Sequence, residues 1–234
     1  MSSVRLRPPA QRGELRDRHE DGHRLHHLLW RLGPGVRVCS SAVLGGGIGP
    51  RAWILNAQVP GGYPRLDPDR HLAEIAAAEG LTGPGAGLMT AADVAAYTTG
   101  HDGGVTATVT AGLGVRGWAA APDTANRAPH RPEDAEAPGS PFRPGTVNIV
   151  VMLPVALSDA ALVNAVATAT EAKVQALLDA GLDCSGTPTD AVCVAAPEPG
   201  HDGGEPFAGP RSTWGARIAR AVHTAVLAGA RTAP

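Results

Sequence analysis

The most apolar run of the sequence is TVNIVVMLPVAL, residues 146–157, and a long helical pattern follows it directly. A run this apolar predicts a central strand that is buried on both faces and ends near Pro154. Ser158 is a good N-cap for the next segment, Asp159 suits the positive end of a helix dipole, and Gly181 suits the residue after the C-cap. The chain is therefore expected to fold as a buried sheet with a long helix packed against it.

Further strands and helices can be placed from hydrophobic periodicity and from capping residues. Asp67 before Pro68 predicts a helix start, and the alternation over 104–113 predicts a strand with its threonines on one face. The predicted strands are 36–44, 51–59, 104–113, 115–121, 146–157 and 186–196, and the predicted helices are 67–80, a short one near 91–97, 158–180 and one that begins near Ser212. Strands and helices do not alternate strictly along the chain, and they are not separated into an all-strand half and an all-helix half. We therefore expect an α+β fold. It is a single domain with a mixed or antiparallel β-sheet layered with helices, and an α/β layered sandwich is the alternative.

Length and composition bound the domain organisation. With 234 residues, 43% of them hydrophobic, the chain can bury one substantial core. Residues 1–27 are rich in charge and contain Pro8-Pro9, so they are expected to be a variable, poorly ordered lead-in. The domain is then expected to span 28–234. Within it, proline and charge replace aliphatic residues over 122–144, which predicts an exposed loop.

The charge pattern and the cysteines restrict partners and compartment. The formal net charge is −2, and the arginines are spread along the chain instead of forming the basic patch that nucleic-acid binding needs. No segment has the pattern of a signal peptide or the length of a membrane span. Cys39, Cys184 and Cys193 show no CxxC spacing and are predicted to be buried thiols. We therefore expect a cytoplasmic protein without nucleic-acid or membrane partners, and a homo-oligomer remains open.

Two short motifs have simple structural interpretations. Gly45–Gly49 follows a predicted strand, but Pro50 and a second strand come where a dinucleotide-binding loop would open into a helix. A tight connection between strands is the better interpretation. His71 and Glu74 lie one turn apart on a predicted helix, and we interpret them as a surface pair because a metal site needs a further ligand.

Lys173 is the only lysine among the 20 basic residues of the chain. An ammonium is a compact donor whose pKa can move on burial, whereas a guanidinium is a planar fork of fixed charge, so its retention indicates a need for an ammonium. Glu171 lies two positions away on the predicted helix and points elsewhere. Lys173 then either extends past the edge of the core to solvent or reaches a carboxylate on another element, for which Asp190 is the candidate. The helix is predicted to bury Val163, Val166, Thr170, Val174 and Leu177 and to expose a polar stripe of Asn164, Thr168, Glu171 and Gln175.

Three blocks of the chain carry a resemblance to a known family. They are SSAVLGGGIGPRAWILNAQVP (40–60), PGTVNIVVMLPVALSDAALVNAVATATEAKVQALLDAG (144–181), and GTPTDAVCVA (186–195) with GPRSTWGARIARAV (209–222). Over most of 28–229 the chain resembles adenosylcobinamide amidohydrolase. The resemblance implies hydrolysis of the amide that joins aminopropanol to adenosylcobinamide, giving adenosylcobyric acid for cobalamin salvage. It implies a corrinoid substrate and no separate cofactor, because the cobalt arrives chelated in the substrate; an activating ion remains open.

Hydrolysing an amide requires a nucleophile, a proton donor for the leaving amine and stabilisation of an oxyanion. The chain has neither a GxSxG elbow nor an HExxH motif. In one remaining mechanism, Glu171 or Asp190 activates water while Lys173 protonates the amine or holds the oxyanion. In the other, a hydroxyl attacks with a lysine or carboxylate as base, and the candidates are Ser40, Ser41, Thr187 and Thr189. The predicted catalytic residues are Glu171, Lys173 and Asp190, with the first mechanism preferred.

Binding a corrinoid requires partners for its rim of amides, closely approaching backbone and an apolar wall. Trp53 or Trp214 could supply the wall. The predicted substrate-binding residues are Ser41, Gly46, Asn56, Asn148, Asn164, Thr187 and Thr189, and no metal ligands are predicted. The alternative functions are a corrinoid-binding protein without catalysis and an amidohydrolase that acts on a different amide.

Overall fold

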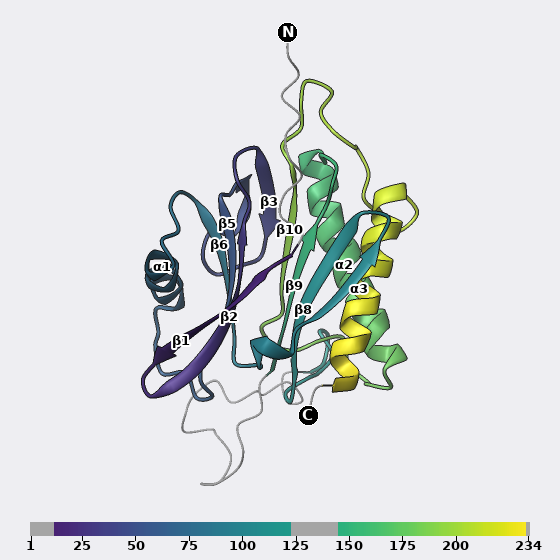
Figure 1. Cartoon of the computed structure of the whole chain (residues 1–234). Coiled ribbons are helices and arrows are strands. Elements are labelled where there is room, and N and C mark those ends of the chain that lie inside the picture. The colour runs from purple at the N-terminus through teal and green to yellow at the C-terminus, as the bar shows by residue number, and fades with distance from the viewer. Residues whose placement is uncertain (1–11, 123–144, 233–234) are drawn as a thin grey trace.

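The apolar run 146–157 forms β9 (Gly145–Met152), an inner strand of a six-stranded sheet. The computed structural model describes residues 12–122 and 145–232 (Figure 1). β9 pairs in parallel with β10 and antiparallel with β8, so the sheet is mixed. The order across the sheet is β4 (Gly47–Pro50), β3 (Val36–Ser40), β10 (Ala191–Pro197), β9, β8 (Val105–Leu113) and β7 (Thr98–Asp102). The predicted central strand is confirmed.

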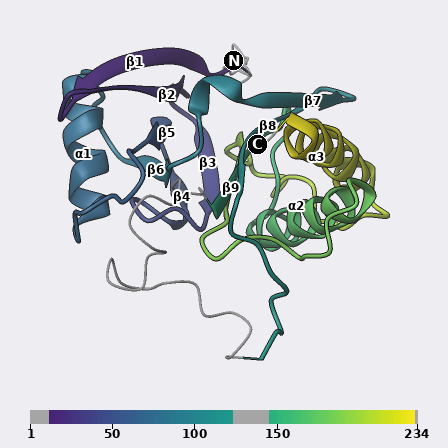
Figure 2. The same cartoon turned by 90° about the horizontal axis from the view of Figure 1, so that it is seen from below.

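Two long helices, α2 (Asp159–Asp179) and α3 (Thr213–Thr232), cover one face of this sheet (Figure 2). Ser158 caps α2 as predicted, because its Oγ accepts a hydrogen bond from the N–H of Ala161 (3.1 Å). Ile149 and Leu162 are among the fully buried residues of the core between sheet and helices. Each such side chain contributes about 1.5–3 kcal/mol of transfer free energy.

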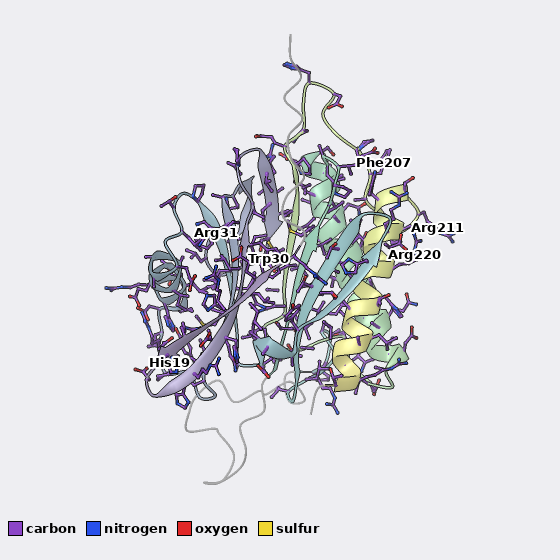
Figure 3. The ribbon with its side chains drawn as sticks, viewed as in Figure 1. His19, Trp30, Arg31, Phe207, Arg211 and Arg220 are labelled. Atoms are coloured by element: carbon purple, nitrogen blue, oxygen red, sulfur yellow. The ribbon has the colours of Figure 1, made fainter. Side chains whose placement is uncertain are left out.

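A second, four-stranded sheet packs on the other face of the first. Its order is β1 (Glu14–Glu20), β2 (His23–Arg31), β5 (Trp53–Gln58) and β6 (Gly85–Thr90). Trp30, which is labelled in Figure 3, belongs to a buried cluster with Ile54 of the second sheet and Val150 and Met152 of the first. The core between the two sheets therefore contains large apolar side chains, and it also buries the polar side chains of Asn56, Thr110 and Asn148.

Helix α1 (Pro68–Ala78) covers the outer face of the four-stranded sheet. Leu72 and Ile75 pack there against Trp53 and Leu55. The molecule thus has four layers, in the order helix, sheet, sheet and helix pair. This arrangement confirms the predicted α+β class, in which a mixed sheet is layered with helices.

The predicted lead-in of residues 1–27 is wrong for the residues that the structure describes. β1 and the first half of β2 lie within it and pair antiparallel from Glu14 to Glu20. β1 is an edge strand, whose exposed face accommodates charges, and Arg24 pairs with Asp17 across the hairpin (3.1 Å). β2 buries Leu25 and His27 on one face, and its Leu28 and Trp30 belong to the core between the two sheets. A strand of this kind needs only one apolar face, so its charges do not indicate disorder.

Other strand assignments also differ from the prediction. The segment 115–121 is not a strand and makes only the bridge Gly117–Gly186. β4, β6 and β7 are absent from the predicted set, because glycine-rich or polar segments lack the apolar pattern used to find strands. In β6, glycine is required at Gly85, where a Cβ would overlap the ring of Trp53. The predicted loop at 122–144 lies outside the described residues except for its first residue.

The predicted faces of α2 are also wrong in part. Val163 is exposed, whereas Thr168 is buried and donates a hydrogen bond to the carbonyl oxygen of Ala208 (2.8 Å). The buried face is formed mainly by small residues: Ala161, Ala165, Ala169, Ala172 and Ala176. Small side chains allow α2 to approach the sheet and α3 closely, so alanines occupy positions for which the pattern favoured valines.

His27 is fully buried on β2, and burial lowers the pKa of its imidazole despite the nearby carboxylate of Glu79. Its Nε2 lies 3.1 Å from Glu79 Oε1, although the contact lacks hydrogen-bond angles. Below the ordinary histidine pKa of about 6.5, the unfolded chain binds a proton that the folded chain does not. The free energy of unfolding is therefore expected to fall as the pH drops below that value.

Urea unfolding at pH 7.5 and pH 5.5 tests this contribution in the native chain and in His27→Gln. The substitution should make the difference in unfolding free energy between the two pH values smaller, because the other histidines remain in both proteins. An equal or larger difference in the variant would show that His27 does not cause the acid sensitivity.

Candidate functional site

Lys173 and Asp190 form an ion pair that is largely withdrawn from solvent. Lys173 lies on the buried side of α2, and Asp190 immediately precedes β10. The Nζ atom of Lys173 donates to Oδ2 of Asp190, and the two side chains are 8% and 13% exposed. The predicted partner of the only lysine is therefore confirmed, and Glu171 is not that partner.

The carboxylate of Asp190 accepts hydrogen bonds from three further donors. The backbone N–H of Val147 donates to Oδ1 (2.8 Å), and the backbone N–H of Thr187 donates to Oδ2 (3.2 Å). The hydroxyl of Thr187 also donates to Oδ1. A carboxylate has about four lone-pair positions, so these three donors and Lys173 fill its capacity. Asp190 thereby connects α2, the start of β9 and the loop before β10.

Gly186 packs directly against the ion pair of Lys173 and Asp190. A Cβ at this position would overlap both Oδ2 of Asp190 and Nζ of Lys173, so only glycine leaves room for the ion pair. The carbonyl oxygen of Gly186 accepts a hydrogen bond from the N–H of Gly117 (3.0 Å), and the N–H of Ser185 donates to the carbonyl of Gly117 (3.0 Å). The segment after β8 therefore lies directly against the ion pair.

The ammonium of Lys173 has N–H donors that Asp190 does not use and that could bind a reacting group. An ammonium has three N–H donors, and within 12–122 and 145–232 Asp190 is its only hydrogen-bond acceptor. Donors with full charge at a site of low solvent exposure stabilise a developing oxyanion more strongly than they would in water. The arrangement can therefore hold an oxyanion or protonate a departing amine.

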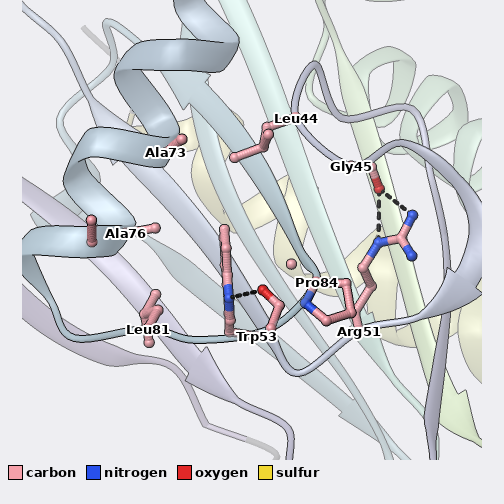
Figure 4. Close-up of a pocket in the computed structure, with 11 residues that line it drawn as sticks. Leu44, Gly45, Arg51, Trp53, Ala73, Ala76, Leu81 and Pro84 are labelled. Carbon is pink, nitrogen blue, oxygen red and sulfur yellow. Dashed lines mark hydrogen bonds between the residues drawn. The ribbon is translucent and has the colours of Figure 1, made fainter.

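A cavity of about 470 Å³ lies at a different place, between α1 and the amino ends of β5 and β6 (Figure 4). Its lining includes Leu44, Gly45 and Trp53. The guanidinium of Arg51 donates to the carbonyl oxygen of Gly45 through Nε (3.0 Å) and through one of its terminal nitrogens (2.8 Å). Arg51 thus fixes the glycine-rich turn, a role that nothing in the glycine pattern revealed.

The family model described as adenosylcobinamide amidohydrolase matches residues 12–233. The chain belongs to the adenosylcobinamide amidohydrolase family. This name describes a hydrolase that acts on a carbon–nitrogen amide bond, the enzyme class predicted from the sequence. The match begins at residue 12, which agrees with the strands found before residue 28.

Two relatives carry the same description. The adenosylcobinamide amidohydrolase of Methanosarcina mazei is 32% identical over 196 residues, which cover 81% of this chain and 88% of the relative. That of Halobacterium salinarum is 46% identical over 85 residues, which cover 36% of each chain. Among the helices of the described residues, none combines the length and hydropathy needed to cross a membrane.

In this member of the amidohydrolase family, two of the predicted substrate-binding residues lie beside the ion pair. Thr187 is half-buried and donates to Asp190, as described above. Thr189 is exposed, and its hydroxyl lies 2.5 Å from the hydroxyl of Thr146 and donates to the carbonyl oxygen of Gly145 (3.2 Å). Both threonines are thus positioned at the amino ends of β9 and β10.

Three other predicted binding residues have structural partners. Asn148 donates through Nδ2 to Oδ1 of Asn56 (2.8 Å) and to the carbonyl oxygen of Met89 (3.0 Å), and both asparagines are buried between the two sheets. Among residues 12–122 and 145–232, no group donates a hydrogen bond to the Oδ1 atom of Asn148. Ser41 Oγ accepts from the N–H of Val192 (3.0 Å), which ties the end of β3 to β10. Asn56 and Asn148 therefore form a hydrogen bond that links the two sheets.

The structure does not bring Glu171, Asn164 or Gly46 to the ion pair. Glu171 is exposed on the opposite side of α2, because positions two apart on a helix point in different directions. Asn164 precedes Lys173 by nine residues, which is about 13 Å along the helix axis. Gly46 lies in the β3–β4 turn and is exposed. The prediction that Glu171 acts with Lys173 therefore has no geometric support.

The interpretation of His71 and Glu74 as a surface pair is wrong. His71 is buried, with Nδ1 2.8 Å from the hydroxyl of Tyr63 and Nε2 2.8 Å from Oε1 of Glu20, whereas Glu74 pairs with Arg65 (2.7 Å). The edge strand β1 supplies the carboxylate that the local pattern could not reveal. Over the described ranges, no three His, Cys, Asp or Glu side chains are grouped so as to hold a metal ion.

Proposed function

We propose that this chain hydrolyses the amide that links aminopropanol to adenosylcobinamide and thereby produces adenosylcobyric acid. The observation that carries the proposal is the family match over residues 12–233, which spans every described strand and helix. The Methanosarcina mazei relative supports it, because the similarity extends over 88% of that protein.

We assign the chemistry to Lys173, Asp190 and Thr187. Because four donors already occupy the Asp190 carboxylate, it has no free position for an attacking water. Thr187, in contrast, already points its hydroxyl proton at Oδ1. Of the four hydroxyl candidates, Thr187 alone contacts this carboxylate within the described structure, which favours the hydroxyl route over the water route.

In this route the Thr187 oxygen attacks the amide carbon as its proton passes to Asp190, and the ammonium of Lys173 stabilises the oxyanion. Collapse of the intermediate breaks the carbon–nitrogen bond, and the proton held by Asp190 passes to the departing amine. Water then hydrolyses the ester on Thr187, which releases the free acid and regenerates the hydroxyl.

The substrate supplies its own cobalt, so we propose that the reaction uses no cofactor held by the protein. We also propose a cytoplasmic location. Support comes from Cys39, Cys184 and Cys193, all of which are free thiols. Burial raises the pKa of Cys193 to about 12, which keeps this thiol protonated and unreactive.

Incubation of the purified chain with adenosylcobinamide tests the reaction. Mass spectrometry should detect cobyric acid and free aminopropanol in equal amounts, and intact-protein spectra of quenched samples should show a corrinoid adduct on Thr187. Product without an adduct would favour the water route. Binding without product would favour the non-catalytic corrinoid-binding alternative, and release of ammonia or amines only from other amides would favour a different substrate.

A further inference from the structure

The glycine-rich turn between β3 and β4 exposes two aliphatic side chains. Val43 is 53% exposed and Ile48 is 37% exposed. Ala42, directly before Val43, is buried in the core between the two sheets, so the turn has one side that is packed and one that is open. Single exposed aliphatic residues are common on soluble proteins, so the place of these two in the fold decides what they mean.

The turn lies on the same face of the six-stranded sheet as the ion pair. Ile48 is the cross-strand neighbour of Cys39, and cross-strand neighbours point to the same face. Cys39 packs against the core beneath the helices, and Ser41 follows it by two positions along the extended chain. Ile48 and Ser41 are therefore on the side of the sheet from which Lys173 of α2 reaches Asp190.

Ser41 brings the turn close to Asp190 and has an unused donor. The N–H of Ser41 donates to the carbonyl oxygen of Val192 (3.0 Å), two residues after Asp190, so strand geometry puts the α-carbons of Ser41 and Asp190 about 8 Å apart. Ser41 Oγ accepts from the N–H of Val192 (3.0 Å), and within residues 12–122 and 145–232 its own proton is donated to no acceptor. The exposed hydroxyl can therefore donate to a carbonyl oxygen of a ligand.

Arg51 holds the turn in shape before a ligand arrives. Its guanidinium donates to the carbonyl oxygen of Gly45 (2.8 Å; Figure 4) and to that of Gly46 (3.2 Å). Leu44 also exchanges backbone hydrogen bonds with Gly87 of β6 (2.9 and 3.3 Å). A surface that is fixed in this way loses little conformational entropy when it binds a ligand.

We propose that Ser41, Val43 and Ile48, the turn surface, hold the corrin ring of the substrate while an amide-bearing side chain of that ring reaches Lys173. This assignment rests on the proposed function, because it takes the ion pair as the catalytic centre. The chemical class that fits is a broad ring with apolar faces and amides at its rim. The two aliphatic side chains contact the face of the ring, and the Ser41 hydroxyl donates to a carbonyl at the rim.

The turn surface takes the role that the sequence assigned to Trp53 or Trp214. Trp53 is 6% exposed, and the guanidinium of Arg217 lies over the ring of Trp214, 4.4 Å from its centroid. One ring is thus buried, and the other already stacks with a cation.

The test compares the double variant Val43→Ser with Ile48→Ser, the single variant Ser41→Ala and the control Val163→Ser. Val163 is an exposed valine (57%) on α2 and is outside the turn surface. The double variant should raise KM for adenosylcobinamide about tenfold or more with kcat within about threefold, because the surface contributes to binding and not to bond cleavage. Ser41→Ala should raise KM about threefold, the usual effect of one lost hydrogen bond. Val163→Ser should change neither constant.

Affinity for cobinamide, measured by ultrafiltration and corrin absorbance, gives a second readout that needs no turnover. An unchanged dissociation constant in the double variant would overturn the turn surface, and so would an equal loss in Val163→Ser. If the native chain binds cobinamide through the turn surface but forms no cobyric acid, the proposed reaction fails while the turn surface stands. A smaller mass of the double variant by light scattering, with unchanged affinity, would identify the turn as a contact between copies of the chain. Circular dichroism confirms that each variant is folded.

Discussion

Replacing Lys173 with arginine is expected to lower kcat for adenosylcobinamide hydrolysis by about 100-fold or more, the usual size of a lost acid or electrostatic contribution. A guanidinium keeps the positive charge, but its planar fork binds a carboxylate at two points and holds its proton at any physiological pH. It would therefore remain attached to Asp190, and its other N–H donors would be held by the rigid fork away from the positions that the ammonium donors occupy. Release of aminopropanol, measured at saturating substrate, checks the prediction.

Gln175→Arg is the matched control, because it adds the same side chain to the exposed side of α2. This variant should retain the activity of the native chain. A native rate in Lys173→Arg would contradict the role given to the ammonium. Loss of folded structure in that variant, seen by circular dichroism, would call for Lys173→Met, which is smaller and should show a comparable loss of turnover.

The ion pair could be predicted from sequence because two local arguments converge on it. Helix geometry separates Lys173 from Glu171, and Asp190 lies where a polar segment becomes a buried strand. The other groups around the carboxylate could not be predicted in the same way. The N–H of Val147 reaches Asp190 only because β9 and β10 are adjacent and parallel, and strand order is a tertiary property.

The main elements were predictable where the apolar pattern was strong, as in β9 and α2. The pattern was weak at β6, where close packing against Trp53 requires Gly85, and at β1, where charges occupy an edge. The buried asparagines show a further limit. An amide on an apolar strand can face a ligand or a second sheet, and for Asn56 and Asn148 only the pairing of two sheets decides.

The same geometry predicts that Asp190→Ala destabilises the chain by about 3–5 kcal/mol, because it leaves the buried ammonium without its counter-ion. It also removes the acceptor of two backbone N–H groups. Lys173→Met should cost less, since the carboxylate keeps three donors. Urea unfolding at neutral pH measures both losses.

Combining Lys173→Met with Asp190→Leu separates the structural role of the pair from its chemical role. Replacing both charges of a buried pair with apolar groups is often close to neutral, so the double variant should recover part of the stability lost in Asp190→Ala. Recovery should stay incomplete, because the N–H groups of Val147 and Thr187 still lack an acceptor, at about 1–3 kcal/mol each when buried. Turnover should remain absent in the stabilised double variant. If the double variant recovered turnover together with stability, the ion pair would only stabilise the fold. The catalytic groups would then have to lie elsewhere.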